Sequence, residues 1–286
     1  MQEALRRSER VTFRGHLGLS LAGIVDRPVN EPKGWAVFAH CFTCSKDIKA
    51  TVRISRALAS LGYGALRFDF MGLGDSEGDF SQSNFTTNRG DLKSALEFVR
   101  NHLGPPTLLI GHSFGGAASL AVAQDDPTVR GVATIASPSD THHLAALLEK
   151  MNPLIAAQGS GEVTIGGRTY RIDSQMLDDF RSFDMQAVLS TFTKPALIFH
   201  APGDETLKFS HALRLLHALT RGTKHQREQF HDSHSLSSLI SLPGADHLLT
   251  NRPADIEYVT SMITAWWQRL LEVDTSTAPT SSPTAH

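Results

Sequence analysis

The chain has few cysteines, no excess of one charge and no long apolar run, and each absence excludes a class of protein. Its two cysteines, Cys41 and Cys44, lie in one CFTC cluster, which cannot staple distant parts of a secreted fold and agrees with a reducing compartment. A formal net charge of -2 provides no positive field for nucleic acid. No apolar run approaches the roughly 20 residues that span a bilayer, and the charged start MQEALRRSERV lacks the apolar core of a secretory signal. We therefore expect a cytoplasmic protein without nucleic-acid or membrane partners.

Short apolar runs alternate with longer segments of helical period, a pattern typical of crossover units on a mostly parallel sheet. Strands are expected at Trp35–His40, Gly64–Phe70, Thr107–Gly111, Val129–Ala136, Ala196–His200 and Ser238–Leu242. Helices are expected at Lys46–Leu61, Thr87–His102, Phe114–Gln124, Ser210–Leu219 and Pro253–Leu271. Segments around Val11–Arg14 and Leu19–Val25 indicate an N-terminal antiparallel hairpin. The predicted fold class is α/β, with helices on both faces of the sheet.

The length and the 41% hydrophobic content fit one domain, predicted over residues 1–272. Residues 137–193 interrupt the alternation for longer than an ordinary connection. They contain EVTIGGRTYRID, a hairpin pattern around Gly166 and Gly167, and are interpreted as a small lid. Residues 273–286 lack an apolar period and are expected to form a disordered tail.

The strongest motif is GHSFG at Gly111–Gly115, which follows a predicted strand and precedes an alanine-rich predicted helix. This context is the one that a nucleophile elbow requires, with Ser113 on a sharp turn and glycines where side chains would clash. The structural alternative is a serine that only caps a helix. We predict that Ser113 is a nucleophile.

A serine hydroxyl needs a base and a third group that orients the base. Asp204 lies in HAPGD at the carboxyl end of a predicted strand, and His247 lies in PGADH before the last helix. The order serine, acid, histidine along the chain is the one that accompanies a nucleophile elbow of this kind. Asp140 in SPSD is the rival acid, and Asp204 could instead be a turn or cap residue.

A tetrahedral oxyanion requires backbone donors, which we predict to be the N–H groups of Phe42 and Phe114, with Cys41 as second choice for the former. The expected reaction is hydrolysis of a small-molecule carboxylic or thio ester through an acyl-enzyme. It requires no metal or organic cofactor. The sequence leaves monomer and homodimer open.

Together, HCFTCSKD, RFDFMGLGDSEGDF, GHSFGGAAS, HAPGDETL and PGADHLL resemble the α/β-hydrolase superfamily over about residues 10–270. The segments AHCFTCSKDIKA and DFMGLGDSEGDFSQSNF are similar to the hydrolase half of proteins fused to an OsmC-like domain. Cys41 stands where most relatives carry glycine in the oxyanion loop. The resemblance implies esterase or acyl-hydrolase activity. It also implies that the loop containing Asp69 and Asp75 is structural.

Three alternatives remain open. Cys41 and Cys44 form a C-x-x-C pattern, which suggests a thiol redox protein, an esterase that oxidation switches off, or merely two small buried side chains. A binding module could retain the fold without catalysis. Local density of His225, His231, Asp232 and His234 suggests either a metal site or, more simply, a solvated loop.

Overall fold

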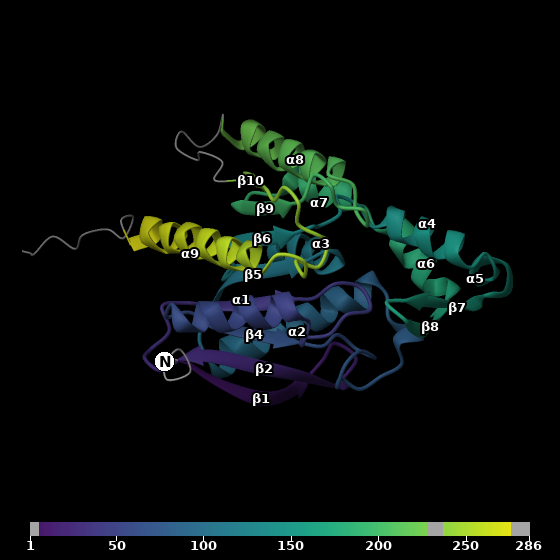
Figure 1. The fold of residues 1–286 in the computed structure, drawn as a ribbon, viewed down its shortest axis with the longest axis horizontal. Coiled ribbons are helices and arrows are strands. Elements are labelled where there is room, and N and C mark those ends of the chain that lie inside the picture. Colours follow the sequence, from purple (N-terminus) through teal and green to yellow (C-terminus); the bar gives the residue numbers. More distant parts are fainter. Residues whose placement is uncertain (1–5, 228–236, 276–286) are drawn as a thin grey trace, which may run out of the picture.

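The computed structural model describes residues 6–227 and 237–275, which form an eight-stranded sheet with helices on both faces (Figure 1). The strand order is β1-β2-β4-β3-β5-β6-β9-β10. The strands are β1 (Arg6–Arg14), β2 (Ser20–Pro28), β3 (Trp35–Ala39), β4 (Gly64–Phe68), β5 (Pro106–His112), β6 (Gly131–Ile135), β9 (Ala196–His200) and β10 (Ser238–Ser241). β1 and β2 pair antiparallel with each other and β2 pairs antiparallel with β4, whereas the other neighbours are parallel. The predicted parallel sheet with an N-terminal hairpin is confirmed.

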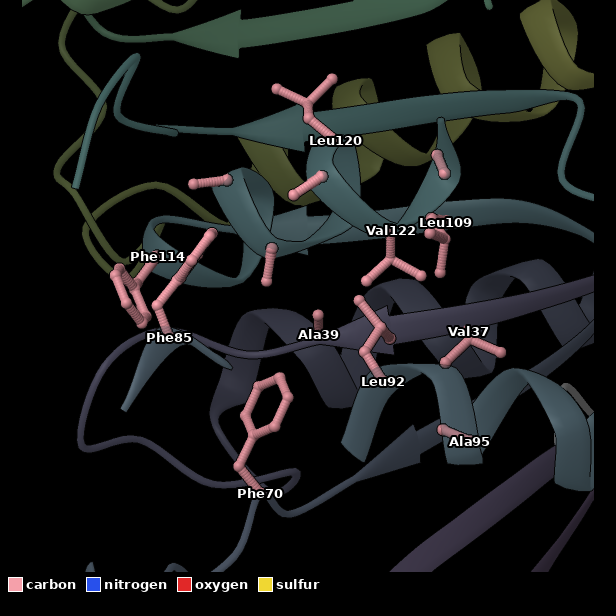
Figure 2. Close-up of a cluster of buried hydrophobic side chains, with 14 of the residues drawn as sticks. Val37, Ala39, Phe70, Phe85, Leu92, Ala95, Leu109, Phe114, Leu120 and Val122 are labelled. Atoms are coloured by element: carbon pink, nitrogen blue, oxygen red, sulfur yellow. The ribbon is translucent and has the colours of Figure 1, made fainter. Parts of the chain in front are cut away.

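Two helical layers cover the sheet. On one face lie α1 (Lys49–Ser60) and α9 (Pro253–Thr275), and on the other lie α2 (Phe85–His102), α3 (Phe114–Ala123) and α8 (Ser210–Arg227). Figure 2 shows Val37 and Leu109 of the sheet facing Leu92 of α2 and Val122 of α3. Strands β3 to β6 and β9 are buried along their whole length, which explains why they read as continuous apolar runs rather than alternating patterns.

A separate lobe lies at one end of the sheet, between β6 and β9 in the chain (Figure 1). Its elements are α4 (His142–Met151), α5 (Leu154–Gln158), β7 (Ser160–Ile165), β8 (Arg168–Asp173) and α6 (Ser174–Ser182), and α7 (Met185–Thr191) leads back to the sheet. The predicted hairpin is present as β7 and β8, and Gly166 and Gly167 supply the positive φ angles of its turn. We call residues 137–193 the insertion.

The insertion is attached to the sheet domain by hydrogen bonds as well as by packing. The Asp179 carboxylate of α6 accepts from the Phe85 and Thr86 backbone N–H groups at 2.7 and 3.2 Å and from the Thr86 hydroxyl at 2.6 Å. These donors are at the start of α2, where a negative charge is favoured. Among the apolar side chains of the insertion, Leu147, Met151 and Leu154 are exposed, whereas Leu148, Ile155, Met176, Leu177 and Phe180 are buried.

Two of the element boundaries that differ from prediction lie next to the contacts of the buried Lys46. Helix α1 begins at Lys49 rather than Lys46, and β4 ends at Phe68 rather than Phe70. Lys46 Nζ lies 2.7 Å from Oδ2 of both Asp69 and Asp75, and its backbone N–H donates to Asp69 Oδ1 at 2.6 Å. These contacts with Lys46 support the predicted structural role of the loop that contains Asp69 and Asp75. At the other end, α9 runs through Thr275, so only residues 276–286 of the predicted tail lie outside the described residues.

Replacing Lys46 with methionine should destabilise the fold strongly. The Asp69 side chain is fully buried, and removing its cation leaves a buried carboxylate without charge compensation, which costs about 3 kcal/mol of unfolding free energy or more. Urea unfolding measures the change. Lys49→Met is the matched control, because Lys49 is exposed and should lose less than about 0.5 kcal/mol. Equal losses in both variants would contradict the argument.

Candidate active site

Ser113 lies on the sharp turn between β5 and α3. Its backbone has φ 52° and ψ -123°, a conformation that costs a residue with a side chain on the order of 1–3 kcal/mol. A Cβ at Gly111 would lie 2.4 Å from the Gly115 carbonyl oxygen, and one at Gly115 would lie 2.3 Å from the Ala39 carbonyl oxygen. The two flanking glycines are therefore required by backbone contacts.

The structure brings Ser113, His247 and Asp204 together from three separate loops. His247 Nε2 lies 3.0 Å from Ser113 Oγ, and His247 Nδ1 lies 2.8 Å from Asp204 Oδ2. A carboxylate only accepts, so Nδ1 carries the hydrogen and Nε2 is left as an acceptor for the serine hydroxyl. This arrangement can move a proton from the serine hydroxyl to an imidazole whose charge a carboxylate stabilises.

Asp204 is held in its ionised form. Burial raises the pKa of this carboxyl, but hydrogen bonds from the His247 ring and from the Leu207 and Thr206 backbone N–H groups lower it by more. Both amides donate to Oδ1 at 2.9 Å, which leaves Oδ2 directed at the imidazole.

Asp140, the rival acid, lies in a different cluster. Its carboxylate accepts from the His143 backbone N–H at 3.1 Å and pairs with His211 and Arg214 at 3.7 and 3.8 Å. A hydrogen bond from the His143 ring, followed by the one from its backbone N–H, holds the pKa of the Asp140 carboxyl well below its usual range. Among the described residues it makes no contact with His247, so the geometry favours Asp204.

Asp140, His143 and His211 are close enough to consider as metal ligands, with one ligand atom of each within 4.8 Å of the others. His211 Nδ1, however, already accepts from the Ser139 backbone N–H at 3.1 Å and from Arg214 Nη2 at 2.9 Å. Burial and this guanidinium lower the pKa of His211 to about 4. The Arg214 guanidinium therefore occupies the place beside His211 and Asp140 that a metal ion would need. The other candidate set, His225, His231, Asp232 and His234, lies outside the residues whose side chains the structure describes.

Cys41 and Cys44 form a disulfide, so they are not two separate buried thiols and do not support the reducing compartment that the sequence suggested. The bond encloses Phe42 and Thr43, and Thr43 has a φ of 61°. Two further contacts fix this turn, which we call the oxyanion loop (residues 40–44). His40 Nδ1 donates to the Cys41 carbonyl oxygen at 2.8 Å, and the Tyr170 hydroxyl of β8 donates to the Thr43 carbonyl oxygen at 3.1 Å.

The predicted oxyanion donors lie on adjoining segments. The Phe42 and Phe114 rings are in contact with centroids 5.8 Å apart, and the close approach of Gly115 to the Ala39 and His40 carbonyls joins the start of α3 to the oxyanion loop. Within the ranges that the structure describes, neither the Phe42 nor the Phe114 N–H donates to a protein acceptor.

The sequence motifs alone assign no role to His40, His112 and His200. All three are buried where β3, β5 and β9 end, and burial lowers the pKa of each. For His112 the pKa falls to about 3, from burial first and the nearby His247 second. The available signal was positional, because each directly ends or follows an apolar strand.

Strand order, connections and the position of Ser113 after β5 place the chain among the α/β-hydrolases. The chain belongs to the family described as serine aminopeptidase, S33, whose model matches residues 30–254. No helix in the described ranges is both long and apolar enough to cross a membrane.

Solved structures agree with this assignment. The esterase domain of a Rhodothermus marinus protein is 37% identical with a TM-score of 0.70, covering 92% of this chain and 98% of that one. Est1E of Butyrivibrio proteoclasticus, solved with ferulic acid, has a TM-score of 0.75 over 92% of this chain and 100% of its own, but at 18% identity it supports the fold alone.

Curated relatives match over shorter regions. The Mus musculus palmitoyl-protein thioesterase ABHD10, mitochondrial, is 27% identical over 59% of this chain and 57% of its own length. The Danio rerio lysophosphatidylserine lipase ABHD12 is 27% identical over 55% of this chain and 40% of its own length. The matches thus span about half the length of these two relatives.

Acidification should destabilise the protein between about pH 6.5 and pH 3. Because the folded pKa of His112 is about 3 and its ordinary value is 6.5, the unfolded chain binds a proton in this window that the folded chain does not. The stabilisation is complete above pH 6.5 and is lost as the pH falls. At about pH 5, His112 alone should cost about 2 kcal/mol.

Urea unfolding at about pH 7.5 and pH 5 measures this loss. His112→Gln, which cannot titrate, should lose about 2 kcal/mol less than the parent between the two pH values. The same loss in parent and variant would exclude His112 as the source.

Proposed function

We propose that the chain is a serine esterase that hydrolyses small-molecule carboxylic or thio esters through an acyl-enzyme. The observation that carries the proposal is the continuous hydrogen-bonded series Ser113 Oγ, His247, Asp204. The names of the relatives, which include an esterase domain, a thioesterase and a lipase, support ester cleavage. We assign Ser113 as nucleophile, His247 as base and Asp204 as the orienting acid.

In the proposed reaction, Ser113 Oγ bonds to the acyl carbon while its proton passes to His247 Nε2. The carbonyl oxygen becomes an oxyanion held by the Phe42 and Phe114 N–H groups. His247 then returns the proton to the leaving alcohol or thiol as its bond to the acyl carbon breaks. Water attacks the acyl-enzyme with the same base, and Ser113 is regenerated.

Aromatic side chains around the oxyanion loop favour uncharged acyl groups of modest size. Phe180 of the insertion packs against Phe114 and Phe42 with ring centroids 4.9 and 6.1 Å apart. These rings provide dispersion contacts but no partner for a charge. The proposal also includes a cytoplasmic location and action as a monomer or homodimer, without nucleic-acid or membrane partners.

Replacing Ser113 with alanine should lower turnover of p-nitrophenyl acetate by about 10⁴-fold, because the hydroxyl that forms the acyl-enzyme is gone. Initial rates at saturating ester and labelling of folded protein by a fluorophosphonate both test it. Ser261→Ala, at an exposed serine of α9, is the control and should be labelled normally. Activity in Ser113→Ala near that of the parent would refute the proposal.

A p-nitrophenyl ester series of increasing acyl length, with an acyl-CoA and a p-nitroanilide alongside, defines the substrate class. Short and medium esters should react fastest if the rings of Phe42, Phe114 and Phe180 limit the size of the acyl group. Faster anilide than ester turnover would instead indicate a peptidase.

The disulfide favours a second proposal, that the redox state of Cys41 and Cys44 sets the activity of the same site. The sequence suggested that oxidation would switch the enzyme off. The disulfide and the Ser113–His247–Asp204 contacts occur together, so we infer the opposite direction. The closed bond restrains Phe42, whose N–H is a proposed oxyanion donor, and reduction removes that restraint.

Reduction by dithiothreitol should lower kcat for p-nitrophenyl acetate about threefold to tenfold. A complete loss of one oxyanion donor would cost more, about 10²-fold. Dithiothreitol supplies two electrons, becomes a cyclic disulfide and leaves two protein thiols, which thiol titration counts. Cys44→Ser should show low kcat with or without dithiothreitol. If kcat is unchanged although both thiols are titrated, the redox state of Cys41 and Cys44 does not set the activity.

A further inference from the structure

Two buried histidines outside the triad lie at strand ends that lead into the catalytic loops. His112 is the last residue of β5, directly before Ser113, and His200 is the last residue of β9, four positions before Asp204. Their exposed fractions are 2% and 1%. Buried polar side chains are normally held by specific hydrogen bonds, so the partners of these rings indicate what they do.

His112 connects the nucleophile's strand to the loop of the base. Its Nε2 lies 2.7 Å from the backbone carbonyl oxygen of His247, and the two rings are 5.3 Å apart between centroids. A carbonyl oxygen only accepts, so Nε2 is the protonated nitrogen. The residue adjacent to Ser113 therefore fixes the peptide that carries the imidazole acting on Ser113.

His200 makes an equivalent contact to the loop of the acid. Its Nε2 donates to the Leu207 carbonyl oxygen at 2.8 Å, and the Leu207 N–H donates to Asp204 Oδ1 at 2.9 Å. The same nitrogen is 3.7 Å from Asp204 Oδ2. Holding Leu207 thus holds the amide that orients the carboxylate.

Both rings are in the same protonation state. The Nδ1 atoms of His112 and His200 are buried and have no hydrogen-bond partner among the described residues, so neither site offers an acceptor for a second proton. Burial lowers the pKa of both rings. A neutral ring beside His247 avoids repelling the imidazolium that forms when Ser113 loses its proton.

We propose that His112 and His200 are positioning residues, neutral donors that fix the His247 and Asp204 loops relative to Ser113. The inference rests on the proposed triad. It goes beyond that proposal by assigning a role in kcat to two residues that touch no reacting atom.

Leucine and glutamine variants at each position test the role. Leucine removes the donor, whereas the glutamine amide can still donate to the carbonyl. For p-nitrophenyl acetate, His112→Leu and His200→Leu should lower kcat about 10- to 100-fold with KM within about twofold, since small misplacements of catalytic groups have effects of this size. The glutamine variants should stay within about threefold of the parent. His217→Leu, on an exposed part of α8, should behave as the parent.

Thermal unfolding separates positioning from stability, because the leucine and glutamine variants should differ in kcat even at matched melting temperature. If His112→Leu does not fold, His112→Asn replaces it, since its shorter amide cannot reach the carbonyl and should lose kcat equally. Parent-like kcat in the leucine variants, or equal losses in leucine and glutamine variants, would overturn the inference. Ser113→Ala assayed in parallel distinguishes the two proposals: an active Ser113→Ala refutes the triad, whereas an inactive one with active His112→Leu refutes only the positioning role.

Discussion

The turn at Ser113 is the constraint on which the rest of the site depends. Its positive φ raises the side chain above the sheet, and this conformation persists only because its surroundings over-determine it. Gly115 packs against the Ala39 and His40 carbonyls, and the Ser113 N–H donates to the Ile135 carbonyl oxygen at 2.8 Å. The turn is thus fixed from β3 on one side and β6 on the other.

Parallel strands explain why residues so distant in sequence meet there. β5 and β9 flank β6, and all three end at the same edge of the sheet. Loops after β5, β9 and β10 carry Ser113, Asp204 and His247. The strands bring the loops to one edge, and hydrogen bonds from His112 and His200 to backbone carbonyls hold the loops there. A polar layer buried at this edge has a cost if any member loses its partner, which ties catalytic alignment to fold stability.

Much of the fold and the candidate triad could be predicted from sequence because their signals are local. Fully buried strands appear as apolar runs, and GHSFG requires its glycines whatever the partners. The contacts of Lys46 with Asp69, of His112 with the His247 carbonyl and of Asp179 with the start of α2 could not be predicted. Each depends on register between segments that only the folded chain brings together. The same holds for Asp140, whose motif suited an acid but whose carboxylate faces His143 and Arg214.

The insertion is attached both to the start of α2 and to the oxyanion loop. Moving it away from the sheet domain would break three hydrogen bonds to Asp179 and the Tyr170 bond to the oxyanion loop, each with a net value of about 1 kcal/mol. It would also expose Phe180, which is fully buried and worth about 2 kcal/mol or more. Because Tyr170 holds Thr43, such a movement would also release the loop that contains Phe42. The insertion and the loop that contains Phe42 are therefore coupled, because moving the insertion removes a contact that holds the loop.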